Sequence, residues 1–354
     1  MTVIEPFLLS LLSAPGLSGS EEPVSRIIAE KWRPLVDEIS FSRLGSLHAL
    51  RKSAVEGKSP SLMIAAHMDA VGLVVRKIED GYLLIRSVGG VDERILPGQA
   101  VIVHGRKEIP GVVQMLPDRL MPSNLANEPL RFSRLFVDTG FTQKELEKFV
   151  QIGDVISFAQ SPILFRDDYI AGHSLDNRAS IAALTVCLEE LKNYNLQWNV
   201  WAVATVQEEG TLRGAATSSY KIRPDIAIAM DVTFAKGPGS NNHMTFAMGK
   251  GITIGIGSNV HPALSRLFKK IAEEIDMPYA MEPMPRSSGT DSIAMQITAD
   301  GIPNMVIGIP IRYMHTPVEM ASINDIMRAG RLLARFITGL ETNALETIFS
   351  GKSS

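Results

Sequence analysis

Three apolar runs in this chain are each followed by acidic or histidine residues. The runs and the polar residues after them are 62–66 with His67 and Asp69, 201–207 with Glu208 and Glu209, and 226–230 with Asp231. Continuous apolar runs of this length are typical of buried strands. Buried strands rarely end in charged groups that have no partner. Because open α/β sheets bind ligands outside the carboxyl ends of their strands, we expect these three strand ends to contribute to one ligand site.

Helical and strand patterns alternate through most of the chain. The expected helices are 175–193, 212–221, 262–275, 290–299 and 322–348, and the expected strands are 199–206, 226–230, 244–256 and 304–309. Alternation of this kind is typical of α/β proteins. The predicted fold is therefore a doubly wound, mostly parallel sheet with helices on both faces.

Between residues 71 and 164 the pattern changes to short strands separated by glycine and proline turns. Residues 79–81 (Glu-Asp-Gly), between two such strands, are typical of a β-hairpin turn. The α/β alternation resumes after this segment, so we predict an insertion into one domain. The predicted domains are an α/β catalytic domain of residues 1–70 plus 165–354 and an inserted β-rich domain of residues 71–164.

Composition and charge narrow the possible partners. The net charge of −3 gives no basic surface for nucleic acid. No uninterrupted apolar stretch reaches the roughly 18 residues of a membrane span. The start of the chain lacks the basic residues of a signal peptide, and the single cysteine, Cys187, excludes an intrachain disulfide framework. We therefore expect a cytoplasmic protein that binds neither nucleic acid nor membrane.

The acidic and histidine residues match the needs of a site for two divalent metal ions. Such ions lie about 3.5–4 Å apart around a bridging group, and each takes a histidine and a carboxylate of its own. The predicted ligands at strand ends and turns are His67, Asp176, Glu209, Asp231 and His315. Glu208 is then free to act as the general base for a metal-activated water. Asp69 is expected to accept the second ring N–H of His67 and so fix its tautomer.

Five segments carry a resemblance to a known family. They are residues 65–69 (Ala-Ala-His-Met-Asp), 174–179 (Ser-Leu-Asp-Asn-Arg-Ala), 206–215 with the Glu208–Glu209 pair, 230–232 (Met-Asp-Val) and 314–319 (Met-His-Thr-Pro-Val-Glu). In order and spacing they resemble the M42 metallo-aminopeptidases, which include the glutamyl aminopeptidases and the tetrahedral aminopeptidases of peptidase clan MH. The resemblance spans nearly the whole chain, including the inserted β-rich segment.

This resemblance implies a role for each residue. His67 and Asp231 would bind one metal, Glu209 and His315 the other, and Asp176 would bridge both. Glu208 would activate a metal-bridging water that attacks the first peptide bond of a short peptide.

The resemblance also implies the cofactors and the assembly. The ions would be Zn or Co, with Mn a further candidate, because histidine and carboxylate ligands suit all three. The fold would be zinc-exopeptidase-like, with a PDZ-like inserted domain that forms dimers. Such dimers would build a homo-oligomer, up to a tetrahedral dodecamer. Two positions depart from the family pattern, Gly210-Thr211 and Asn177, and neither removes a ligand.

Two other functions fit parts of the same pattern. A metal-independent glycoside hydrolase, similar to an endoglucanase, needs only two carboxylates, and Glu208 with Asp231 could supply them. The histidines would then have no role. A non-catalytic assembly protein on the same fold would tolerate Glu208→Gln without loss of function. Taken singly, Asp176 could be a helix N-cap and the Glu208–Glu209 pair a solvated turn, so the hypothesis depends on the whole set.

Overall fold

A computed structural model of the protein describes residues 4–120, 128–166 and 168–349. Within these residues eleven strands form one sheet in the order β1-β2-β12-β3-β13-β16-β17-β11-β10, with β14 paired to β16 and β15 to β14. The strands are β1 (Glu38–Phe41), β2 (Leu47–Arg51), β3 (Ser61–His67), β10 (Ile163–Phe165), β11 (Tyr169–Gly172), β12 (Asn199–Thr205), β13 (Ile226–Phe234), β14 (Ile252–Gly257), β15 (Tyr279–Met284), β16 (Asn304–Arg312) and β17 (Glu319–Ser322).

The four central strands, β12, β3, β13 and β16, are parallel, whereas the strands toward both ends of the order pair antiparallel. The mostly parallel sheet predicted from the sequence is therefore right for the centre and wrong for the edges. The reason is connection length: β1–β2 and β10–β11 are joined by short turns, which suit antiparallel neighbours, while parallel neighbours need a longer crossover. The central strands are buried along nearly their whole length, as expected for strands covered on both faces.

Two groups of helices pack against this sheet. Helices α1, α2 and α4 contact one another and α9 packs on α4, and α4 and α9 also contact the central strands. Helices α6 and α8 form a second pair against β12, β13 and β16. The helices outside the insertion are α1 (Glu5–Ser13), α2 (Glu22–Trp32), α4 (Leu175–Leu191), α5 (Glu208–Thr211), α6 (Arg213–Ile222), α7 (Pro262–Glu274), α8 (Ser292–Gln296), α9 (Ile323–Thr338) and α10 (Ala344–Phe349). The described part of the chain contains no helix long and apolar enough to cross a bilayer.

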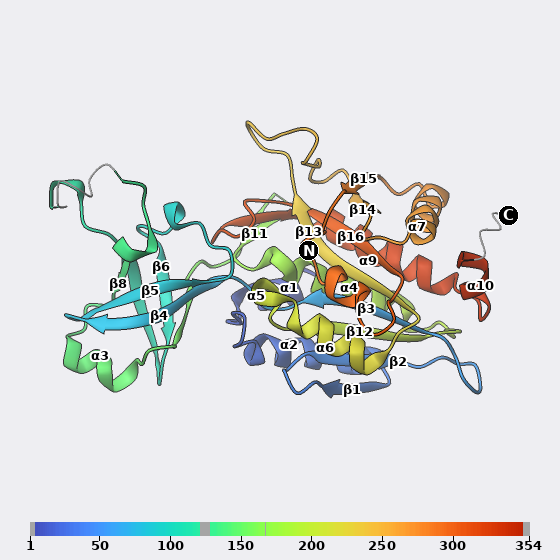
Figure 1. Ribbon diagram of the computed structural model, residues 1–354, viewed down its shortest axis with the longest axis horizontal. Coiled ribbons are helices and arrows are strands. Elements are labelled where there is room, and N and C mark those ends of the chain that lie inside the picture. The colour runs from blue at the N-terminus through green and yellow to red at the C-terminus, as the bar shows by residue number, and fades with distance from the viewer. Residues whose placement is uncertain (1–3, 121–127, 167, 350–354) are drawn as a thin grey trace.

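The inserted segment forms a closed barrel in the strand order β4-β5-β8-β7-β6-β9, with its own apolar core. Figure 1 shows it as a separate lobe at the left of the molecule. The predicted turn at Asp80 and Gly81 is confirmed, since both residues have positive φ between β4 and β5. Closure of the strands into a barrel agrees with a β-rich insertion but does not by itself identify a PDZ-like fold, which stays a prediction. Its elements are β4 (Gly72–Glu79), β5 (Tyr82–Val88), β6 (Ala100–His104), β7 (Glu108–Gln114), β8 (Phe136–Asp138), α3 (Gln143–Phe149) and β9 (Val155–Phe158).

Three local expectations are corrected by the structure. The helix expected at 322–348 is two helices, α9 and α10, because Gly339, Thr342 and Asn343 between them are poor helix formers. The strand expected at 244–256 is only β14, since Gly249 and Gly251 turn the backbone to positive φ before it. Asp231 does not close its strand, because β13 continues to Phe234.

Candidate active site

Asp176 lies between the two predicted histidine ligands. Its Oδ1 is 3.1 Å from Nε2 of His67, and its Oδ2 is 3.4 Å from Nε2 of His315. The residue lies at the start of α4, where its backbone angles are not helical. Its side chain lines the cavity of the site. Burial opposes its ionisation, but hydrogen bonds from His315 and His67 hold the pKa of Asp176 well below its usual range. One carboxylate therefore faces two histidines with its two oxygens.

His67, the last residue of β3, is surrounded by acids on its Nε2 side. Oδ1 of Asp231 lies 3.7 Å away and Oε2 of Glu208 lies 3.8 Å away. Asp231 comes from β13, the parallel neighbour of β3, and Glu208 follows β12 on the other side. Residues at or near the carboxyl ends of three adjacent strands thus meet at this imidazole, as the apolar runs of the sequence predicted, although β13 continues three residues past Asp231.

Asp69 positions the site differently from the prediction. Its backbone carbonyl, and not its carboxylate, is the hydrogen-bond partner of His67 Nδ1, at 3.1 Å. The nearer carboxylate oxygen lies 3.6 Å away. The carboxylate oxygens instead accept the backbone N–H groups of Glu208 and Glu209, at 3.0 and 3.2 Å. Asp69 therefore fixes both the histidine tautomer and the turn that carries the glutamate pair, and only the first role follows from the sequence.

This turn lets two consecutive glutamates face one site. Neighbouring residues on a strand point to opposite faces, but β12 ends at Thr205 and Gln207 has a left-handed backbone, with φ of 57°. Glu208 then begins the single helical turn α5. The Gln207 N–H is held by Oε1 of Glu21 at 3.1 Å. The backbone has therefore turned before the pair, so both side chains can reach the site.

Glu209 and His315 form the second half of the cluster. Oε2 of Glu209 is 3.4 Å from Nε2 of His315, while its buried Oε1 has no hydrogen-bond partner in the structure. The other ring nitrogen of His315 lies 3.0 Å from the carbonyl oxygen of Gly90, which follows β5 of the barrel. The inserted segment therefore orients a predicted ligand of the α/β domain, a contact for which the sequence holds no signal.

Glu319 is a positioning residue that the sequence reasoning quoted in a motif but gave no role. Its side chain is buried, and its two oxygens accept the backbone N–H groups of Asp176 at 2.9 Å and His315 at 2.7 Å. One carboxylate thus joins the backbones of two predicted ligands that are distant in the sequence. The available signal was a glutamate four residues after a candidate ligand, at the start of a strand.

We expect Glu319→Gln to weaken metal binding by about 10- to 100-fold, the usual cost of losing a group that orients a ligand. An amide has one acceptor oxygen, and its NH₂ group would point a donor at a second donor. Metal titration followed by calorimetry measures the effect, with the exposed Glu346→Gln as a control. An unchanged affinity in Glu319→Gln would show that its two hydrogen bonds do not position the ligands.

The cluster carries more negative charge than its own residues balance. Among the described residues, the ion pairs of Asp176, Glu208, Glu209 and Asp231 involve only His67 and His315. Burial raises the pKa of Glu208 and of Glu209 well above the usual range, and neighbouring carboxylates add to the effect. Buried carboxylates of this density suit metal coordination.

Two triads in the cluster bring ligand atoms within 4.8 Å of one another: His67 with Glu208 and Asp231, and His67 with Asp176 and Glu209. The first triad includes Glu208, which the sequence analysis kept free as a base. The role of each residue toward a metal therefore stays a prediction.

The cluster opens into a cavity of about 470 Å³. Its wall includes the turn at Gly210 and Thr211, the end of β13 up to Phe234, and the segment Ser288 to Thr290. The next residue, Asp291, is buried and accepts a hydrogen bond from Thr205 Oγ1 at 2.5 Å. The cavity gives a ligand access to both histidines.

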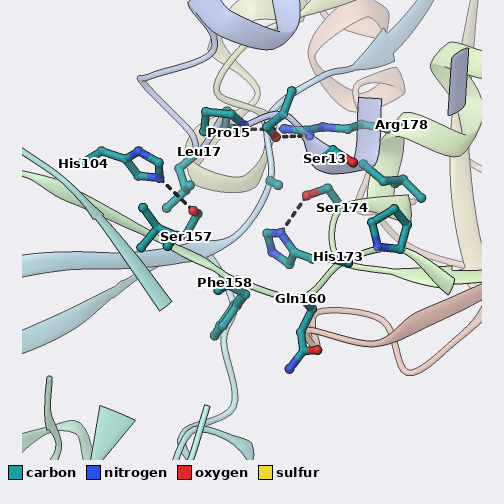
Figure 2. Close-up of a pocket in the computed structure, with 18 of the residues that line it drawn as sticks. Ser13, Pro15, Leu17, His104, Ser157, Phe158, Gln160, His173, Ser174 and Arg178 are labelled. Carbon is teal, nitrogen blue, oxygen red and sulfur yellow. Dashed lines mark hydrogen bonds between the residues drawn. The ribbon is translucent and has the colours of Figure 1, made fainter. Parts of the chain in front are cut away.

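A second cavity, of about 250 Å³, lies between the N-terminal segment, the barrel and the start of α4 (Figure 2). Arg178 in its wall is fully buried. Nearby, His173 contacts the carbonyl of Val71 at 3.0 Å, and burial lowers its pKa to about 3, so the ring is neutral. Arg178 donates to the backbone carbonyls of Leu11, Ala14, Gly16 and Met68. These hydrogen bonds anchor the N-terminal segment beside the end of β3, so we interpret this region as support for the active site.

Comparison with known proteins places this geometry in a family. The family model described as M42 glutamyl aminopeptidase matches residues 45–332. A lysyl aminopeptidase of Pyrococcus furiosus is 34% identical over 89% of this chain and 91% of its own. A TET aminopeptidase from a marine sediment archaeon (Thaumarchaeota archaeon SCGC AB-539-E09) superposes with a TM-score of 0.91 at 27% identity, covering 98% of this chain and 100% of that one. The Pyrococcus horikoshii TET1 peptidase, which can assemble into a tetrahedron or a large octahedral shell, gives a TM-score of 0.83 at 26% identity, covering 95% and 100%. The chain therefore belongs to the M42 family and is an aminopeptidase, a hydrolase that acts on N-terminal residues.

Proposed function

We propose that this aminopeptidase works with two divalent metal ions and removes N-terminal residues from short peptides. The observation that carries the proposal is the position of Asp176, whose two oxygens face His67 and His315 at 3.1 and 3.4 Å. A carboxylate that bridges two ions about 3.5–4 Å apart needs this placement. The same residue in a metal-free hydrolase would need only one partner.

The residues around Asp176 fit such a pair of ions. His67 and Asp231 would complete one ion's ligands, and Glu209 and His315 the other's. The unpartnered Oε1 of Glu209 supports this assignment, because a buried carboxylate oxygen without a hydrogen bond is costly unless a cation binds it. When bound, the ions supply Lewis acidity to the scissile carbonyl and lower the pKa of a water molecule. Zn and Co are the ions we propose, with Mn as a further candidate.

Glu208 is the residue we propose as general base. Its Oε2 lies at the edge of the cluster, 3.8 Å from His67 Nε2, and its side chain lines the cavity. The Asp69 carboxylate holds the Glu208 backbone N–H, so the side chain starts from a fixed position. Oε2 of Glu208 would take the proton of the attacking water and return it to the nitrogen of the leaving amine. Asp69 itself acts through the backbone of the glutamate pair and is a positioning residue.

We further propose that residues 71–164 form a dimerisation domain and that dimers build a larger homo-oligomer, up to a tetrahedral dodecamer. The barrel supports this proposal, because it has a core separate from that of the α/β domain and lies as a lobe beside it (Figure 1). The related TET1 peptidase assembles into shells. A closed shell would admit short peptides and exclude folded proteins.

Removal of metal is expected to abolish release of N-terminal residues, and Zn or Co is expected to restore it. The reason is that the other four proposed ligands cluster with the Asp176 carboxylate, and no other described group in the cluster could polarise the substrate carbonyl equally. The measurement is hydrolysis of aminoacyl p-nitroanilides before and after dialysis against a chelator, with the metal content determined in parallel.

Two outcomes would contradict the proposal. Peptidase activity that survives complete chelation would exclude a role for metal. Release of reducing sugar from a polysaccharide, insensitive to chelator, would instead favour the glycoside hydrolase alternative. The geometry argues against that alternative, since it leaves His67 and His315 without a role although both lie against carboxylates.

A further inference from the structure

Glu282 lines the cavity, and its carboxylate forms no ion pair with His67 or His315. The other acidic residues lining the cavity, Asp176, Glu208, Glu209 and Asp231, lie within 4 Å of His67 or His315. Glu282, in β15, instead accepts hydrogen bonds from two threonine hydroxyls. Thr233 Oγ1 lies 2.7 Å from its Oε1, and Thr253 Oγ1 lies 2.5 Å from its Oε2. The catalytic proposal gives this residue no role.

The strand register brings Glu282 close to the catalytic cluster. Asp231 pairs with Gly308 of β16, and Gly308 pairs with Thr253 of β14. Thr233, the first threonine partner, lies two residues after Asp231 on β13, so both side chains point to the same face of the sheet. Two residues of a strand span about 7 Å. The Glu282 carboxylate is therefore about one side-chain length from the ligand Asp231.

Gly308 makes room for this carboxylate. A Cβ atom at this position would lie 2.2 Å from Thr253 Oγ1 and 3.1 Å from Glu282 Oε2. Because Gly308 has no side chain, the glutamate and its two threonines can extend over β16 toward the cavity. The hydrogen bonds from the threonines fix the direction of the carboxylate, and each of its oxygens keeps a further lone pair for a ligand.

The charge of the cavity suits a cationic side chain at this point. Among the described residues that line it there is no lysine or arginine, so no basic side chain in that described lining competes for the carboxylate of Glu282. Burial raises the pKa of Glu282, the two threonine hydrogen bonds lower it, and a cation beside the carboxylate would favour its ionised form. Phe234 and Met314 in the same wall offer apolar surface to the methylene stem of a long side chain.

We infer that Glu282 is a specificity-determining residue that selects peptides with a basic N-terminal residue, lysine or arginine. The substrate's α-carbon would lie at the Asp176 cluster, and its four-carbon stem would span the distance along β13 to the carboxylate. The inference rests on the proposed aminopeptidase mechanism at that cluster. It adds a preference that the mechanism itself does not require.

The test compares lysyl, arginyl and norleucyl p-nitroanilides on the metal-loaded enzyme and on Glu282→Gln. Norleucine keeps the linear stem without the ammonium group. We expect the wild-type enzyme to prefer the basic substrates. In Glu282→Gln we expect kcat/KM for them to fall by about 10- to 100-fold, the usual worth of a hydrogen bond to a charged group. The loss should appear mainly in KM, because the contact exists in the ground state as well as the transition state. The norleucyl substrate should be unaffected.

Two further variants and one binding assay make the result specific. Glu282→Asp keeps the charge and should restore part of the preference for lysine, whereas the exposed Glu30→Gln on α2 should change nothing. Free lysine should inhibit the wild-type enzyme more strongly than free norleucine, and Glu282→Gln should remove that difference.

The inference is overturned if Glu282→Gln leaves the ratio of lysyl to norleucyl activity unchanged. An equal loss on both substrates would do so as well, because Glu282 would then contact the α-amine or support the fold of the site. A wild-type enzyme that hydrolyses all three substrates without preference would refute the inference alone. Activity on none of them, with metal bound, would also refute the inference, whereas hydrolysis that survives complete chelation would refute the proposed function on which it rests.

Discussion

Glu208→Gln is expected to lower kcat by about 10²- to 10⁴-fold, the usual contribution of a general base, while the protein keeps both metal ions. Glutamine has nearly the size and shape of glutamate but cannot take a proton from water. The variant also keeps the backbone N–H that Asp69 holds, so the turn should be unchanged. The measurement is kcat on a norleucyl p-nitroanilide together with metal content by atomic emission.

The control for this prediction is the neighbouring residue. Glu209→Ala removes one proposed ligand, so it should lose the ion held by His315 and keep the other. If Glu208→Gln and Glu209→Ala lose metal to the same extent, Glu208 is a ligand and not a free base. The triad of His67, Glu208 and Asp231 makes this outcome a real alternative. Full activity in Glu208→Gln would instead favour a non-catalytic role for the pair.

Asp176→Asn is expected to weaken metal binding more than Glu208→Gln or Glu209→Ala does. An asparagine has one acceptor oxygen and no charge, so it cannot face both histidines as the carboxylate does. The affinity for both ions should fall by more than the roughly 10- to 100-fold that the loss of an outer-shell group costs. Catalysis should disappear at metal concentrations that saturate the wild-type enzyme. Calorimetric metal titration and activity at increasing metal concentration measure the two effects.

The exposed Asp300→Asn, with the same chemical change away from the site, is the matched control for Asp176→Asn. Selective loss of one ion would contradict a bridging role and assign Asp176 to a single metal. Retention of both ions with full activity would remove the observation that carries the proposed function.

Much of the fold and site could be predicted because local patterns carry them. The apolar runs before His67, Glu208 and Asp231 predict strands that bring these three residues together, and in the structure the side chains of Glu208 and Asp231 do lie at the imidazole of His67. The inserted β-rich segment was visible as a change in pattern. The edges of the sheet were less predictable, because the direction of an edge strand depends on the length of its connection and on its neighbour.

The features of the site that could not be predicted are hydrogen bonds between carboxylates and distant backbone N–H groups. Asp69 was expected to contact His67 through its carboxylate, but that carboxylate binds the N–H groups of the glutamate turn. Glu319 joins the backbones of Asp176 and His315. A side chain that accepts a hydrogen bond from distant backbone leaves no periodicity in the sequence, so its role appears only in three dimensions.

The sequence by itself determined the chemistry of this protein: which residue types stand at the strand ends, and therefore that histidines and carboxylates would share one site. This follows because apolar runs specify strands locally and the ends of parallel strands share an edge. Only the tertiary structure decided how these residues are arranged. In the folded chain Asp176 lies between two histidines, and the carbonyl of Gly90 in the inserted segment orients His315. Glu282 lies over Gly308 in the cavity wall. These contacts join segments from separate strands and loops, so their geometry depends on how the whole chain packs.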